Sequence, residues 1–201
     1  MKRYWPTWLG LFASVAVVII GLLTGSDLHE KWQLATRYTA QVSFPLFLIT
    51  FVASALVRLF PNAWTRAIMR DRRWWGLGFA ACFLTHLVAL LVYNWLEGRF
   101  PPAGFLDRGV WAYAVLLAMI LTSTNAARRR LGRGWTILHR IGMWGFLVIF
   151  ALTPYLDDFL TLKMPDDNPL VDPYTLSCLA AIALKAAARG KTQWKRRMLA
   201  G

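Results

Sequence analysis

Two histidines within apolar segments are the residues of this sequence best suited to chemistry. His86 lies in the run CFLTHL, and His139 lies in the run WTILHR. An ionisable side chain at membrane depth is costly, and such residues tend to be functional. A histidine there can hydrogen-bond to a neighbouring helix, relay a proton or ligate a metal, very often haem iron. The remaining histidine, His29, follows the first apolar segment, where we expect a polar, solvated loop.

A single histidine of this kind is more often a packing residue than a ligand. Two of them, on segments that run in the same direction, favour haem binding, because helical bundles clamp a porphyrin between side chains of facing helices. The two cysteines, Cys82 and Cys178, fall in different apolar segments and lack the close spacing of a metal site or a redox pair. We expect both to be small apolar packing residues.

Six apolar segments must position these residues. A helix needs about 20 mostly apolar residues to cross roughly 30 Å of hydrocarbon. The stretches that reach or approach this length are 8–25, 38–59, 74–96, 110–125, 135–155 and 173–188. The first has a longer apolar stretch than a signal-peptide core, so we interpret it as a retained anchor. Because no linker or long loop divides the chain, the sequence predicts an all-α fold: one polytopic membrane bundle of six transmembrane helices, residues 1–201.

Acidic and basic residues alternate between the connections of these segments. Nine of the ten acids lie in every second connection, and the arginines concentrate in the others, at 66–73, 128–133 and 189–197. Lys and Arg that flank spans stay on the cytoplasmic side, which predicts that both termini are cytoplasmic. The formal net charge of +13 therefore indicates membrane orientation. It does not indicate nucleic-acid binding, which would gather basic residues on one soluble face.

A long motif in the second half of the chain gives a family resemblance. It runs LTSTN at 121–125, three arginines, LGRGW at 131–135 and then Leu138-His139. It closely resembles the fourth-to-fifth helix connection of MsrQ-type haem-binding membrane subunits, which belong to the ferric reductase-like transmembrane superfamily. The run RRWWGL at 72–77 followed by His86 is similar to that family's entry to its third helix, and Thr36-Arg37 is a weaker match. The resemblance covers about residues 36–150.

The resemblance implies a bundle in the bacterial inner membrane that holds b-type haem and passes electrons across the bilayer. Electrons would come from a quinol, a flavin such as FMN or a cytosolic reductase, and would leave to a periplasmic partner. His86 would match the outer haem ligand and His139 the inner one. The arginines of the motif would lie at the inner surface, where they meet phosphates of lipid or flavin or simply enforce orientation; they are Arg129, Arg130 and Arg133.

The chain departs from this family at the second ligand of each haem. The family carries a further histidine on the fifth helix, but residues 150–155 here read FALTPY. At about 1.5 Å per residue, His86 lies roughly 20 Å from the inner arginines and His139 roughly 9 Å, so the two are unsuited to sharing one iron. Tyr155 is the one plausible protein oxygen for the outer site, although tyrosine at an interface is more often an anchor. At the level expected for the inner haem, the third helix carries Arg72, and an arginine cannot bind the iron because it stays protonated.

Two functions therefore remain open at this stage. One is an electron-transfer subunit with one b-type haem on His86 or His139. The other is a haem-free accessory subunit that kept the fold of the family as a structural part of a larger membrane complex. A transporter has little support, because no broken helix pair or buried acid marks a midplane site. Under both functions we expect a protein partner at the acidic outer loop 157–172, where five acids alternate with apolar residues.

Overall fold

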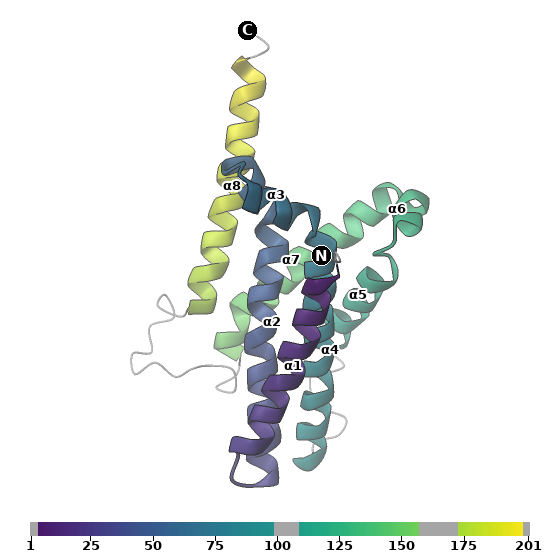
Figure 1. The fold of residues 1–201 in the computed structure, drawn as a ribbon, viewed down its shortest axis with the longest axis vertical. Coiled ribbons are helices and arrows are strands. Elements are labelled where there is room, and N and C mark those ends of the chain that lie inside the picture. Colours follow the sequence, from purple (N-terminus) through teal and green to yellow (C-terminus); the bar gives the residue numbers. More distant parts are fainter. Residues whose placement is uncertain (1–3, 99–108, 157–172, 199–201) are drawn as a thin grey trace.

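The computed structural model describes residues 4–98, 109–156 and 173–198, and these residues form helices and short connections without a strand. The chain order is α1 (Trp5–Thr24), α2 (Leu28–Leu59), α3 (Ala63–Arg70), α4 (Arg72–Leu96), α5 (Val110–Leu121), α6 (Asn125–Leu131), α7 (Arg133–Leu156) and α8 (Pro173–Met198). Figure 1 shows that α1 begins and α8 ends toward the end of the bundle that carries α3 and α6. The turn between α1 and α2 lies at the opposite end.

Length and composition make this an all-α membrane protein. Four described helices are long and apolar enough to cross a bilayer, and the bent pair α5 and α6, which meet at 105°, brings the number to as many as five. The spanning helices α1, α2, α4 and α7 contain four of the six predicted segments. The predicted span 173–188 lies in α8, whose apolar stretch is interrupted by Lys185 and Arg189. The fourth predicted span is helical only to Leu121, where the chain turns toward α6.

Small residues hold α1, α2 and α4 together as a close-packed unit. A Cβ at Gly10 would overlap the carbonyl of Gly78, and a Cβ at Gly21 would lie 2.6 Å from the backbone nitrogen of Ala35. The Ser14 and Thr85 hydroxyls, on α1 and α4, are 3.1 Å apart. Close backbone approach through small residues is how helices associate within membranes. These three helices therefore form a closely packed unit, visible side by side in Figure 1.

Two elements differ from the sequence-based expectation. Helix α2 begins at Leu28 and not near residue 38, because Asp27 caps it by accepting a hydrogen bond from the Glu30 nitrogen. The expected loop at His29 is thus wrong: this residue lies in the first turn of α2, contacts Glu97, and has its ring centroid 5.0 Å from that of Tyr93 in a tilted arrangement. The second difference is α3, a short helix with an Asn62 capping box that lies between the two long helices.

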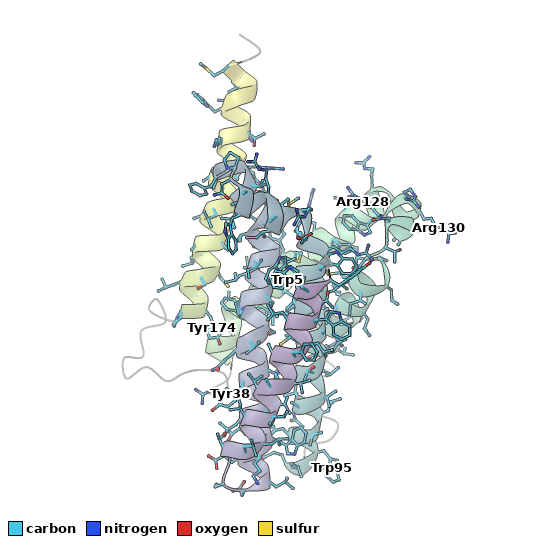
Figure 2. The ribbon with its side chains drawn as sticks, viewed as in Figure 1. Trp5, Tyr38, Trp95, Arg128, Arg130 and Tyr174 are labelled. Carbon is cyan, nitrogen blue, oxygen red and sulfur yellow. The ribbon has the colours of Figure 1, made fainter. Side chains whose placement is uncertain are left out.

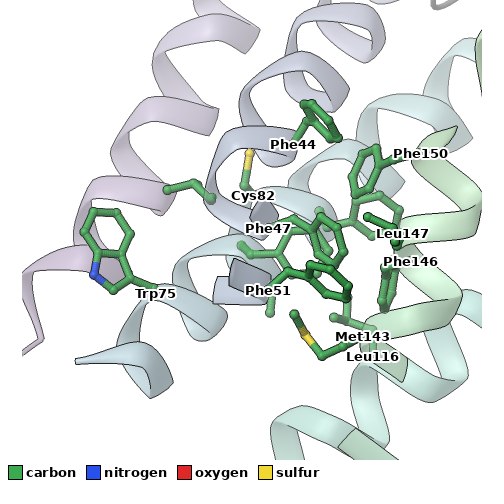
Figure 3. Close-up of a cluster of buried hydrophobic side chains, with 14 of the residues drawn as sticks. Phe44, Phe47, Phe51, Trp75, Cys82, Leu116, Met143, Phe146, Leu147 and Phe150 are labelled. Carbon is green, nitrogen blue, oxygen red and sulfur yellow. The ribbon is translucent and has the colours of Figure 1, made fainter. Parts of the chain in front are cut away.

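Aromatic side chains fill the space where α2, α4 and α7 converge. Phe47 on α2, Phe79 and Phe83 on α4, and Phe146 and Phe150 on α7 form a chain of ring contacts with centroid distances of 5.1 to 6.4 Å. All five are at most 6% exposed. Figure 3 shows the α2 and α7 phenylalanines of this cluster facing one another. This aromatic cluster is the centre of the core.

Candidate functional site

His86 is a buried histidine held by helix α2. It is 8% exposed, and its Nδ1 lies 3.0 Å from the carbonyl oxygen of Thr36 and 3.2 Å from the hydroxyl of Thr39. A carbonyl can only accept, so Nδ1 carries the proton and donates to Thr36. The neutral ring then has its lone pair on Nε2, which makes no hydrogen bond to a described residue. Metal-ligating histidines have this arrangement, with one nitrogen tied to a carbonyl and the other free to bind.

The packing of α1 on α4 places His86 near the middle of the length of α1. Thr85, its neighbour, contacts Ser14, the tenth of the twenty residues of α1. At the first residue of α1, Trp5 packs against Trp75 with ring centroids 5.0 Å apart. His86 lies eleven residues beyond Trp75 on α4, or about 16 Å at 1.5 Å per residue. Half the thickness of the hydrocarbon core is about the same distance.

Aromatic side chains lie beside His86. Phe83 lies next to His86, with ring centroids 5.5 Å apart, and contacts Phe146 and Phe150 of α7. Within the described residues there is no group of three or more His, Cys, Asp or Glu side chains that could hold a metal. The donor chemistry therefore fits haem iron on one face, through His86 alone. On the other face the chain presents aromatic rings.

His139 lies in a corner formed by α5, α6 and α7, and its ring is engaged on two sides. Its Nε2 is 3.3 Å from the Thr122 hydroxyl, and its ring stacks on Trp135 at 4.1 Å. The Thr122 hydroxyl donates its one proton to the Ala118 carbonyl at 2.6 Å, so His139 Nε2 donates to the hydroxyl. The Nε2 atom of His139, the nitrogen that would most readily bind a metal, is therefore already engaged in a hydrogen bond.

The same corner explains the long sequence motif. Trp135 Nε1 donates to the Thr122 carbonyl at 2.9 Å, and the Arg128 guanidinium lies 5.2 Å from the Trp135 ring. Thr124 caps α6, with its hydroxyl accepting from the Ala127 nitrogen. Gly132 connects α6 to α7 with φ of 50°, a conformation that glycine adopts readily. The motif residues thus fold the turn that orients His139. Figure 2 shows Arg128 and Arg130 on α6, away from the three packed helices.

The structure does not bring His86 and His139 together. His86 contacts Thr36 and Thr39 of α2, whereas His139 contacts Thr122 and Trp135. Arg72, which the sequence places at the level of the inner haem, begins α4. His86 lies fourteen residues further along α4, or about 21 Å away by helix rise. Tyr155, the other sequence candidate, lies in the last turn of α7, and its side chain is outside the described ones. The predicted partner loop 157–172 also lies outside the described residues.

Sequence reasoning missed a lysine in the last predicted span. Lys185 on α8 places its Nζ 3.7 Å from the centre of the Phe51 ring and 5.6 Å from that of Trp144. A lysine interrupting an apolar segment was the available signal, because a charge inside a span is costly. Arg72, which the sequence placed at the inner haem level, is half-buried and donates from Nε to the Thr50 carbonyl at 2.8 Å.

Several helices that are long and apolar enough to cross a bilayer, packed as one bundle, define a polytopic membrane protein. The family model described as "Ferric reductase like transmembrane component" matches residues 38–150. The chain therefore belongs to the ferric reductase-like transmembrane family, which confirms the resemblance drawn from the motif.

Two relatives of named function are consistent with this family assignment. The chain is 28% identical over 154 residues to the protein-methionine-sulfoxide reductase heme-binding subunit MsrQ of Cronobacter sakazakii, covering 73% of this chain and 72% of the relative. It is also 28% identical over 170 residues to the MsrQ of Salmonella paratyphi B, covering 80% and 78%. No solved structure matches the chain.

Proposed function

We propose that the protein is a membrane electron-transfer subunit that binds b-type haem through His86. The observation that supports this most directly is the hydrogen bond from His86 Nδ1 to the Thr36 carbonyl at 3.0 Å, which fixes the tautomer with Nε2 free. The named function of the MsrQ relatives, haem binding, points to the same group. When bound, haem would supply a one-electron carrier within the bilayer.

The residues around His86 would hold the group rather than react with it. Thr36 orients the imidazole, the packed helices α2 and α4 fix its depth, and the phenylalanines of α4 and α7 exclude water. An electron donor at the inner end would be a quinol, a flavin or a cytosolic reductase, and the acceptor would be a periplasmic protein. His139 would act as a positioning residue of the α5–α6–α7 corner, because Thr122 and Trp135 already engage its ring.

An optical spectrum tests the haem proposal. Purified protein, expressed with added haem precursor, should show a Soret band that shifts on dithionite reduction. His86→Ala should abolish or strongly reduce this band, whereas His29→Ala should keep it, because His29 lies at the outer end of α2. A size-exclusion profile unchanged from the wild type would show that the His86 variant still folds. Equal absorbance in both variants would refute the assignment to His86.

The aromatic cluster favours a second candidate function, a haem-free accessory subunit. Phe83, Phe146 and Phe150 pack directly against each other between α4 and α7, so the core is filled without a prosthetic group. A protein of this kind would stabilise a larger membrane complex through its fold. Wild-type protein without any Soret band, even after haem supplementation, would support this function over the first.

We further propose six spans in a bacterial inner membrane, with both ends cytoplasmic. One support is that α3, α6 and the end of α8, which carry most of the arginines among the described residues, lie at one end of the bundle in Figure 1. Another is that the relatives come from bacteria. Reporter fusions after residues 101 and 166 should give a periplasmic signal, and one after residue 130 a cytoplasmic signal. A periplasmic signal at residue 130 would overturn the orientation.

The acidic loop 157–172 is the site that we propose for a partner protein. Five acids would steer a basic partner, and the apolar residues between them would bind it. Replacing Asp157, Asp158, Asp166 and Asp167 by Asn should weaken co-purification of the partner and reduce its sensitivity to salt. Undiminished binding at every ionic strength would place the partner elsewhere.

A further inference from the structure

Two cations from different helices contact adjacent residues of α2, Thr50 and Phe51. Arg72 of α4 turns inward to donate to the Thr50 carbonyl of α2, at 2.8 Å. Lys185 of α8 lies over the Phe51 ring of α2 and beside Trp144 of α7. Both side chains are half-buried. Four helices, α2, α4, α7 and α8, therefore surround these two residues, and Arg72 and Lys185 together are called the inner cationic cluster.

The charges that surround this cluster are also positive. Arg72, Arg189 and Arg58 all act on Lys185, and no acid does. Asp71 is the one acid of the described inner end, and Arg70 engages both of its oxygens, at 3.2 and 2.9 Å. Arg72 makes no hydrogen bond to a described residue beyond Thr50, so both of its Nη groups remain available. The described residues thus provide dipoles and aromatic faces for these cations but no counter-ion.

The cluster lies at the level of the lipid headgroups. Arg72 is three residues from Trp75, which packs against Trp5 at the inner end of α1. Because α1 is twenty residues long and crosses the bilayer once, its first residues mark the inner interface. Arg58 and Arg189 are exposed near the same end of the bundle, on α2 and α8. Positive charge therefore extends from the surface of these two helices toward the buried pair.

We propose that Arg72 and Lys185 form a binding site for the phosphate of an anionic phospholipid, with Arg58 and Arg189 at its entrance. The guanidinium Nη groups and the ammonium supply donors and charge for phosphate oxygens. Basic sites between helices on the cytoplasmic side bind such headgroups. The exposed apolar side chains of α8 that precede Lys185, Leu179 and Ile182, would face the acyl chains. The proposal is independent of haem binding, since neither residue contacts His86.

Retention of lipid by purified protein tests the site. Wild-type protein in nanodiscs or detergent is mixed with phosphatidylglycerol or with phosphatidylcholine, and bound lipid is measured by native mass spectrometry. We expect phosphatidylglycerol to be retained preferentially, and Lys185→Gln and Arg72→Gln each to lower its affinity by about fivefold. Lys185→Arg keeps the charge and should keep the affinity. Arg197→Gln removes an exposed charge outside the cluster and should change affinity less than twofold.

A soluble phosphate is the competing source of the same chemistry. In a second arm, binding of FMN and of riboflavin is compared in the same proteins by fluorescence. FMN binding that requires Arg72 and Lys185, without any lipid preference, would assign the site to a soluble phosphate and overturn the lipid proposal. Equal retention of both lipids, or equal losses in the cluster and control variants, would overturn it as well. Lys185→Gln makes the test decisive even if Arg72→Gln fails to fold, because Lys185 donates no hydrogen bond to the described residues.

Discussion

His86 and His139 are the same residue type on two helices of one bundle, yet their surroundings differ in three ways. His86 is buried near the middle of a long helix, whereas His139 is half-buried in the second turn of α7. A backbone carbonyl holds His86 by Nδ1, and a hydroxyl holds His139 by Nε2. The His86 region is built from closely packed long helices, and the His139 corner from short helices and a glycine turn.

The long motif around His139 therefore does not mark the histidine that is better placed to bind a metal, which is His86. The residues of the motif around His139 make hydrogen bonds and ring contacts with one another, so they account for their own pattern as a folded turn. Around His86 the sequence carries little pattern, because its partner is a main-chain oxygen. His86, the histidine whose Nε2 is free, therefore lies in the region with the weaker sequence pattern.

The largest expected effect comes from disrupting the contact of α4 with α1, the helix pair that positions His86. Gly78→Leu places a side chain where the Pro6 carbonyl already lies, and over-packing costs about 1–3 kcal/mol or more when neither partner can move. We expect loss of the monodisperse peak in size-exclusion chromatography. Gly145→Leu on α7, where a Cβ meets nothing within 4 Å, serves as the control. Normal folding of the Gly78 variant would show that α1 and α4 are not packed as described.

A smaller effect is expected at the centre of the His139 corner. Trp135→Ala removes a stacked ring, a hydrogen bond to the Thr122 carbonyl and a cation–π contact. For a half-buried tryptophan the cost is about 2 kcal/mol, or roughly 4–8 °C in Tm for a chain of this size. Any haem absorbance should persist, because His86 is untouched. Trp111→Ala, at a ring that is 69% exposed, should change Tm little.

The turn between α6 and α7 should show an effect of backbone conformation alone. Gly132 has φ of 50°, and a Cβ there would meet no atom within 4 Å. Gly132→Ala should therefore cost about 1–2 kcal/mol through backbone strain and not through a clash. Gly134→Ala has equal space and no positive φ, so its Tm should match the wild type. Equal Tm values for the two variants would contradict the described turn.

The smallest effect concerns the polar contacts of His86. Thr39→Val removes a hydroxyl 3.2 Å from His86 Nδ1 but leaves the Thr36 carbonyl in place. Because the main hydrogen bond remains, the loss should be about 1 kcal/mol or less, measured as a Tm shift of a few degrees at most. Thr39→Ser keeps the hydroxyl and should behave as wild type. A loss as large as that of Trp135→Ala would show that the hydroxyl, and not the carbonyl, holds the ring.

The sequence by itself determined the class of the protein. Apolar length predicted the membrane helices α1, α2, α4 and α7, and the motif at 121–139 gave the family that the family model confirms. His86 was accessible as a candidate because a histidine among apolar residues is rare at membrane depth. Whether exactly six segments span, and on which side the ends lie, stays a prediction from the pattern of charges.

Only the tertiary structure decided what each side chain touches. The partner of His86 lies fifty residues away on α2, and it is a carbonyl, which every residue carries and no pattern of side chains reveals. The contact of Lys185 with Phe51 and the position of His29 beside Glu97 likewise depend on the register between helices. That register is set where glycines allow two backbones to meet, as at Gly10 and Gly78. Periodicity along one helix identifies its buried face, but depth relative to a neighbouring helix arises only when the two pack.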